Sequence, residues 1–202
     1  MSAPSKIFAF VLLMMIGAPL SSPAAGEEPK MKTVTIDKFF DGQLQPLPLR
    51  LSIPANYVHA KGMDVEETYS YWMPPSEVKA AAASGDLPVK TGYIYGKISM
   101  SMAWLPDKKK FSGEAGYKES LKEDGITLIS ERHRDANGYP VWASIASAKS
   151  EDGKSIKRLY MAYLATKIET NCIYIAYMPP AKLPEAESDK IWNSIIDSIG
   201  KK

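Results

Sequence analysis

The sequence is poor in the residue types that most often bind metals or act as nucleophile and base. Its 202 residues include one cysteine, Cys172, and two histidines, His59 and His133. Zinc sites usually gather three or four Cys, His or carboxylate ligands, so soft ligands alone cannot assemble one here. A single cysteine also excludes an internal disulfide. We therefore expect no metal and no cofactor, and stability must come from packing.

An excess of charge of one sign is also missing. The chain has 25 basic and 23 acidic residues, so no global field recruits nucleic acid or anionic lipid. Acidic pairs such as Glu123-Asp124 lack the alternating spacing of a calcium loop. Lys108-Lys109-Lys110 is a short basic run, which is typical of a solvated turn, with a phosphate or lipid headgroup as the alternative interpretation.

The beginning of the chain is typical of a cleavable secretory leader. Lys6 supplies a positive start, an apolar stretch follows from Ile7 to Ala18, and small residues lead up to Ala25. A membrane anchor needs about 20 apolar residues, whereas this run is broken by Pro19. No cysteine stands near the cleavage region to accept a lipid. We expect residues 1 to 25 to be a signal peptide and the product to be free in the periplasm or secreted.

Residues 26 to 202 are expected to form a single α+β domain. Turn signals at Asn137-Gly138 and Asp152-Gly153 predict an antiparallel meander in the second half. Ser76 and Ser112 are expected to cap the first two helices. The predicted helices cover residues 76–83, 112–124 and 184–199, and the predicted strands cover residues 33–40, 49–53, 66–73, 92–104, 126–134, 139–148, 155–166 and 171–178.

Helices are expected on both faces of this sheet. Strands wetted on one side alternate in hydrophobicity, whereas Leu159 to Ala165 and Asn171 to Met178 are nearly continuous apolar runs. The last helix supplies one cover, because it carries a wide apolar stripe that includes Trp192 and Ile195. The predicted fold is a three-layer α/β/α sandwich with a central, mainly antiparallel sheet.

The order of these elements resembles the PsbP-like or Mog-type α/β/α sandwich family. The likeness rests on Leu51-Ser52-Ile53-Pro54, the hairpin at Asn137-Gly138-Tyr139-Pro140, Tyr177-Met178-Pro179-Pro180, and a final helix ending in Ser198-Ile199. Members include exported bacterial proteins, an extrinsic subunit of photosystem II and a small-GTPase-binding protein. The resemblance implies an accessory or binding role rather than chemistry, although a fold alone transfers no activity.

Candidate catalytic residues are few. Cys172 and His133 are the possible thiol and imidazole pair, but Cys172 opens the most apolar strand and is expected to be a buried structural residue. His133 is interpreted as an exposed strand residue whose arginine neighbours disfavour its protonation. Glu123 or Glu131 could pair with an acid from another element, which keeps a hydrolase with dispersed acidic residues as an alternative.

Aromatic residues crowd into residues 63–95, a segment longer than the resemblance implies. They are Tyr69, Tyr71, Trp72, Tyr93 and Tyr95. Tyrosine and tryptophan are strand formers as well as interface anchors, so the segment is interpreted first as an extra hairpin packed into the core, with a surface that recognises a partner as the alternative.

The sequence thus favours an exported, non-catalytic binding or accessory protein of the bacterial envelope that binds another protein. An inhibitor or immunity protein acting on a periplasmic toxin is one alternative, and the dispersed-acid hydrolase is another. No nucleic-acid partner and no membrane insertion after cleavage are expected.

The predicted leader can be tested directly. The mature protein should begin near Ala25 or Gly26 and should be recovered in the soluble envelope fraction. Mass spectrometry of the exported protein measures its first residue, and retention of residues 1 to 20 would contradict the leader.

Overall fold

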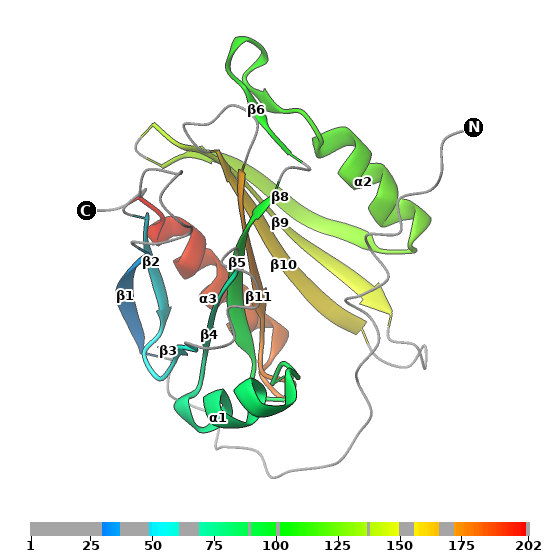
Figure 1. Cartoon of the computed structure of the whole chain (residues 1–202). Helices are drawn as coiled ribbons and strands as arrows, with labels where there is room; N and C mark the ends of the chain where they lie inside the picture. Colours follow the sequence, from blue (N-terminus) through cyan, green and yellow to red (C-terminus); the bar gives the residue numbers. More distant parts are fainter. Residues whose placement is uncertain are drawn as a thin grey trace.

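The structure is a computed structural model, shown in Figure 1. It describes residues 30–36, 49–60, 69–88, 90–99, 102–136, 138–149, 156–165 and 172–200. The predicted leader lies outside these residues. Among the helices that are described, none has the length and hydrophobicity needed to span a bilayer.

The elements follow one another largely as the apolar patterns predict. The strands are β1 (Met31–Ile36), β2 (Leu49–Pro54), β3 (Val58–His59), β4 (Tyr69–Met73), β5 (Tyr93–Ser99), β6 (Trp104–Leu105), β7 (Lys110–Phe111), β8 (Thr127–Asp135), β9 (Pro140–Lys149), β10 (Ile156–Ala165) and β11 (Cys172–Met178). The helices are α1 (Pro75–Ser84), α2 (Glu114–Glu123) and α3 (Glu185–Ser198), with a 3₁₀ turn η1 (Pro106–Lys108).

A seven-stranded antiparallel sheet forms the centre of the molecule. Its strand order is β3-β4-β5-β11-β10-β9-β8, and two-stranded ribbons are formed by β1 with β2 and by β6 with β7. The predicted meander from β8 to β11 is confirmed, with Tyr163 on β10 opposite both Trp142 on β9 and Tyr174 on β11. The segment that contains β4 and β5 is built into this sheet, because β5 pairs with β11.

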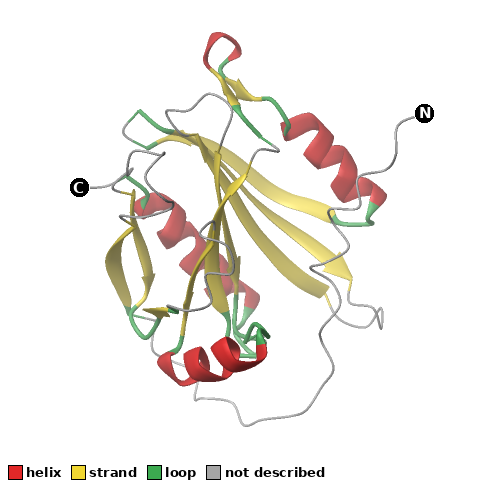
Figure 2. Cartoon of the chain, viewed as in Figure 1, coloured by secondary structure: helices red, strands yellow, loops and turns green. Residues whose placement is uncertain are grey.

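Helix α3 covers one face of the sheet, as expected (Figure 2). The side chains of Trp192 and Ile195 are 1% and 0% exposed, and they pack against strand residues such as Ile145 and Ile175. Burying each of these large apolar side chains contributes about 2 kcal/mol. The amphipathic stripe is therefore the main attachment of the last helix.

Two arginines of β8 hold the carboxyl end of α3. The Arg134 guanidinium donates hydrogen bonds to the carbonyl oxygens of Ile196 and Ile199, and Arg132 lies 3.1 Å from the Asp197 carboxylate. A helix carries partial negative charge at its carboxyl end, where the last carbonyls have no partner within the helix. The arginines therefore satisfy these groups and complement the helix dipole.

Strand β2 is attached to the same end of α3. The Ser52 amide donates to the Ser198 hydroxyl, and the Gly200 amide donates to the carbonyl oxygen of Arg50. Gly200 has a φ of 73°, and a Cβ there would lie 2.8 Å from the Ala136 carbonyl oxygen. Glycine is required at this position because both the backbone conformation and the space exclude a side chain.

Helices α2 and α1 lie on the opposite face. Tyr117 and Leu121 of α2 are buried against Trp142 and Tyr163, as their four-residue spacing predicts. Ala81 of α1 packs with a separate, smaller cluster at the lower end of the sheet (Figure 1). The predicted α/β/α sandwich is thus confirmed.

Three local predictions are wrong. The strand predicted over residues 92–104 ends at Ser99, and Trp104 belongs to the β6–β7 ribbon. Met102 and Ala103 lie outside any strand, although the apolar alternation runs through them. Ser76 and Ser112 do not cap their helices: α1 starts after Pro74, and the Ser112 hydroxyl accepts a hydrogen bond from the Ala103 amide instead.

The attachment of α3 predicts a large effect of a single substitution. Trp192→Ala should lower the free energy of unfolding by about 3 kcal/mol, because it removes a fully buried ring and leaves a cavity. The exposed neighbour Asn193→Ala is the matched control and should change it by less than about 0.5 kcal/mol. Urea unfolding measures both, and equal effects would contradict the packing of α3.

Candidate functional site

A row of aromatic rings crosses the main sheet on the face that carries α2. The rings belong to Tyr71 (β4), Tyr95 (β5), Tyr174 (β11), Tyr163 (β10), Trp142 (β9) and His133 (β8), and successive centroids lie 5.9, 5.6, 5.0, 5.9 and 6.5 Å apart. Side chains that share a face recur at every second residue of a strand, and the strand register places these rings side by side. We call this set the aromatic row.

Two of the five aromatic residues predicted as a partner surface belong to the aromatic row. Tyr71 and Tyr95 are half-buried and nearly parallel, with an interplanar angle of 27°. Trp72 and Tyr93 are only 6% and 5% exposed. Tyr69 begins β4, and its side chain lies outside the described part of the structure.

Trp72 and Tyr93 are core residues, which corrects their assignment to a partner surface. Alternation along β4 turns Trp72 to the α3 face, where it joins the main core. Tyr93 packs with Met73 and with Ala81 of α1. Among the four of these aromatic residues whose side chains are described, Tyr71 and Tyr95 are the two that are partly exposed to solvent.

Two lysines approach rings of the aromatic row. The Lys97 Nζ lies 5.7 Å from the centroid of Tyr174, and the Lys118 Nζ lies 5.8 Å from the ring of Trp142. The face of an aromatic ring attracts a cation at this range. Lys97 therefore places positive charge beside the Tyr71–Tyr95 pair.

A polar network joins α2 to β8 at the other end of the aromatic row. The Lys118 Nζ lies 2.8 Å from Glu114 Oε1 and 2.7 Å from Glu131 Oε2. His133 Nε2 lies 3.0 Å from Glu114 Oε2, and the Trp142 indole N–H donates to Glu131 Oε2 at 3.1 Å. We call these five residues the α2–β8 network.

The network shifts the pKa values of Glu114 and Lys118 in the direction that favours their charged forms. Burial raises the pKa of Glu114, but hydrogen bonds from Lys118 and His133 outweigh burial and the net pKa is lowered. Burial likewise lowers the pKa of Lys118, and its hydrogen bonds with Glu114 and Glu131 more than compensate, so the net pKa is raised. Two carboxylates thus converge around one lysine, and that lysine favours the ionised form of Glu114.

The environment of His133 differs from the prediction. Its side chain is 49% exposed, as expected of a strand residue, but it faces α2 and Glu114. Arg132 and Arg134 alternate to the opposite face and contact α3. The neighbouring arginines therefore do not define the charge around His133, and the sequence missed its acidic partner.

Cys172 and His133 do not form a catalytic pair. Cys172 is fully buried, and burial raises the pKa of its thiol to about 12. Strands β10 and β9 separate its strand from that of His133, which amounts to about 14 Å at the usual strand spacing. A protonated, enclosed thiol is a poor nucleophile, so the expected structural role of Cys172 agrees with its burial.

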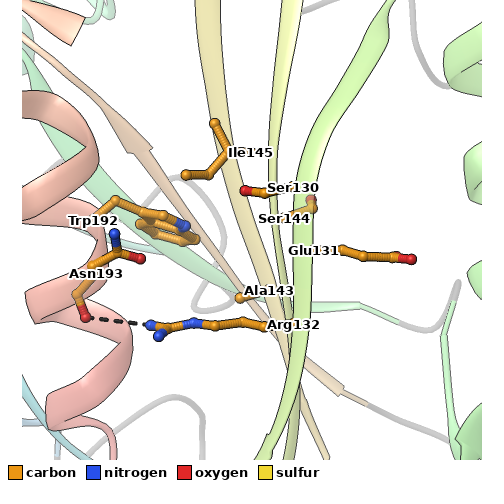
Figure 3. Close-up of a pocket in the computed structure, with 8 residues that line it drawn as sticks. All are labelled: Ser130, Glu131, Arg132, Ala143, Ser144, Ile145, Trp192 and Asn193. Carbon is orange, nitrogen blue, oxygen red and sulfur yellow. Dashed lines mark hydrogen bonds between the residues drawn. The ribbon is translucent and has the colours of Figure 1, made fainter. Parts of the chain in front are cut away.

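A small hollow lies between β8, β9 and α3 (Figure 3). Its volume is about 110 Å³, and Ile145 and Trp192 line its apolar side. Figure 3 shows Arg132 reaching across to the backbone carbonyl oxygen of Asn193, whereas the Glu131 side chain points the other way. Pockets for drug-sized ligands are typically about 300 to 1,000 Å³, so this hollow is too small for such a ligand.

Metal ligands do not gather anywhere in the described residues: no group of three or more His, Cys, Asp or Glu side chains is close enough to hold an ion. Of the aromatic residues predicted as a partner surface, Tyr71 and Tyr95 are the two that the structure describes as half-buried. The members of the α2–β8 network could have been suspected in part, because Glu114 and Lys118 have the four-residue spacing of a helical ion pair.

Comparisons with known proteins give structural likeness only. No protein family and no curated protein matches the sequence. The PsbP protein (CyanoP) of the cyanobacterium Synechocystis is 10% identical, with a TM-score of 0.49, and the match covers 90% of this chain and 98% of that protein. The Ran-binding protein Mog1p of Saccharomyces cerevisiae is 9% identical, with a TM-score of 0.48, and the match covers 84% and 94%.

A protein of unknown function from Pseudomonas aeruginosa, described as a putative regulator, is 14% identical, with a TM-score of 0.45, and the match covers 76% of this chain and 91% of that protein. The likeness extends over most of the chain, as the resemblance stated from the sequence predicts. It concerns the fold alone and assigns no partner, activity or residue role.

The α2–β8 network predicts a pH-dependent contribution to stability. Because the pKa of Glu114 is lowered in the folded state from its ordinary value of 4.5, its contribution is present above that value and is lost as the pH falls through the lowered pKa. Glu114→Gln should cost about 0.5 kcal/mol at neutral pH, which is typical of partly exposed ion pairs.

Urea unfolding at neutral pH and below about pH 4 measures this difference, which should shrink in acid. Glu119→Gln, an exposed position on the same helix, is the control and should show little effect at either pH. An equal loss for Glu114→Gln in both conditions would contradict an electrostatic role.

Proposed function

We propose that this chain is an exported, non-catalytic binding protein of the bacterial envelope that uses the Tyr71–Tyr95 pair to contact a protein partner. The observation that carries the proposal is the stacking of these two half-buried rings at the end of the aromatic row. Export to the periplasm or beyond rests on the leader-like residues 1 to 25.

The pair has the properties of an interface anchor. The Tyr95 ring is held from behind: it is tilted against buried Tyr174 at 5.6 Å and against buried Tyr93 at 6.1 Å, and Tyr71 stacks on it at 5.9 Å. Rings fixed in this way lose little side-chain entropy when a partner binds. Binding energy in protein interfaces concentrates in a few such tyrosine, tryptophan and arginine side chains.

Charge beside the pair adds selectivity. Lys97 lies on the same strand as Tyr95, two residues further along, and therefore on the same face of the sheet. A lysine at the rim of an aromatic patch favours a partner with acidic groups near its contact residues and raises the association rate. An inhibitor or immunity protein that acts on a periplasmic toxin is one form that such binding can take.

The hydrolase alternative has one supporting observation, the convergence of Glu114 and Glu131. In glycosidases one carboxyl group must hold a proton for the leaving group, and the space between the two must admit the substrate. Here the ammonium group of Lys118 lies within 3 Å of both carboxylates and holds the pKa of Glu114 down. The geometry therefore supports anchoring of α2 to β8 better than acid catalysis.

Photo-crosslinking in the native envelope tests the proposal. A photoreactive phenylalanine analogue at position 71 should give a protein adduct of defined mass, and Tyr95→Ala should weaken the purified complex by about 2 kcal/mol, roughly 30-fold in Kd. The same analogue at Ile129, which is 46% exposed on β8, is the control.

An adduct that appears only from position 71 and disappears with Tyr95→Ala supports the tyrosine surface. The proposal fails if position 71 gives no adduct, if position 129 gives the same one, or if Tyr95→Ala lowers the unfolding midpoint enough to explain the loss.

A further inference from the structure

A narrow hairpin projects from the body of the molecule beyond the main sheet (Figure 1). It consists of β6, η1 and β7. Trp104 and Phe111 lie opposite each other in its ladder, with ring centroids 5.1 Å apart, and Phe111 is buried. At its base Ser112 and Ala103 exchange two hydrogen bonds. The base is thus fixed to the core, and the tip is held in a defined position.

The tip carries three consecutive lysines. Lys108, Lys109 and Lys110 are all exposed, and no ion pair joins them to any residue that the structure describes. One acid, Asp107, lies within the turn itself. Although the whole chain is almost neutral, with 25 basic and 23 acidic residues, the tip has a local excess of positive charge.

Lys109 has a backbone conformation that lysine does not favour. Its φ is 47°, in the left-handed region, and it is the single non-glycine residue with positive φ among those described. Glycine, asparagine or aspartate adopts this conformation at lower cost. A lysine in this conformation is strained, and strain of this kind collects at functional sites.

We propose that this hairpin tip, residues 105 to 110, contacts the anionic headgroups of a phospholipid bilayer. The hairpin projects beyond the main sheet (Figure 1), and its three lysines are exposed. An extended plane of negative charge can attract all three at once without a specific docking geometry. Exposed Pro106 and half-buried Leu105 add apolar surface beside the lysines, which suits the boundary between headgroups and acyl chains.

Each lysine near an anionic bilayer strengthens binding about fivefold, so three together give roughly a hundredfold. This attraction decays within a Debye length and therefore weakens as salt is added. The contact is peripheral, and it does not depend on the Tyr71–Tyr95 surface.

Vesicle sedimentation with the purified protein tests the proposal. Vesicles of phosphatidylcholine containing about one third phosphatidylglycerol should bind the protein roughly a hundredfold more tightly than phosphatidylcholine vesicles at low salt. The triple variant Lys108→Gln, Lys109→Gln, Lys110→Gln should lose this difference. The difference between the two vesicle types measures the contribution of charge.

A second triple variant is the matched control. Lys79→Gln, Lys122→Gln and Lys182→Gln removes the same net charge from exposed positions on α1, on α2 and before α3, and it should retain most of the preference for anionic vesicles. Lys109→Gly should weaken vesicle binding about fivefold while the unfolding midpoint stays the same or rises, because glycine relieves the backbone strain.

The proposal is overturned if both triple variants lose binding equally, since net charge would then suffice. It is also overturned if the protein does not discriminate between the two vesicle types, or if Lys109→Gly lowers the unfolding midpoint and leaves vesicle binding unchanged. Binding to an acidic protein with no preference for anionic vesicles would assign the tip to a protein partner instead.

Discussion

The arrangement of the molecule depends on the burial of one apolar stripe, that of α3, against the central sheet. Helix α3 is the last described element, yet it contacts strands from much earlier in the chain. Strand β2 is hydrogen-bonded to the carboxyl end of α3, β8 contributes arginines to the same end, and the central strands pack against its apolar stripe. A helix of this length is marginal by itself in water. The sheet and α3 therefore stabilise each other.

The opposite face of the sheet is organised differently. Its core is largely aromatic, with rings in successive contact from β4 to β8, and α2 is attached by two apolar side chains and by the α2–β8 network. Edge-to-face and offset contacts between rings add to the area that they bury. Because the rings are large and fixed, Tyr71 and Tyr95 at the open end are held more firmly than isolated surface tyrosines.

Much of the fold could be predicted from the sequence because its signals are local and periodic. The turn glycines predicted the meander, and the apolar runs predicted helices on both faces of the sheet. The apolar stripe of α3 predicted the burial of Trp192. The break in the strand pattern at Met102 and Ala103 could not be predicted, since the apolar alternation runs through both residues. The site was harder to predict: strand register decides that Trp72 turns to the core while Tyr71 joins a row of rings, and register depends on residues distant in the sequence.

The alternation of charge along β8 has a consequence for folding accuracy. In the native register Arg132 and Arg134 face the carbonyl groups of α3, and Glu131 and His133 face Lys118 and Glu114. A slip of one residue would exchange the two faces. Glu131 would then lose Lys118 and meet the negative end of α3, and the two arginines would lose the carbonyl groups and Asp197, so both faces of the strand would lose favourable contacts. Strand β8 lies at the edge of the sheet and pairs with one neighbour instead of two. Its charges that face α2 and its charges that face α3 each favour the native register.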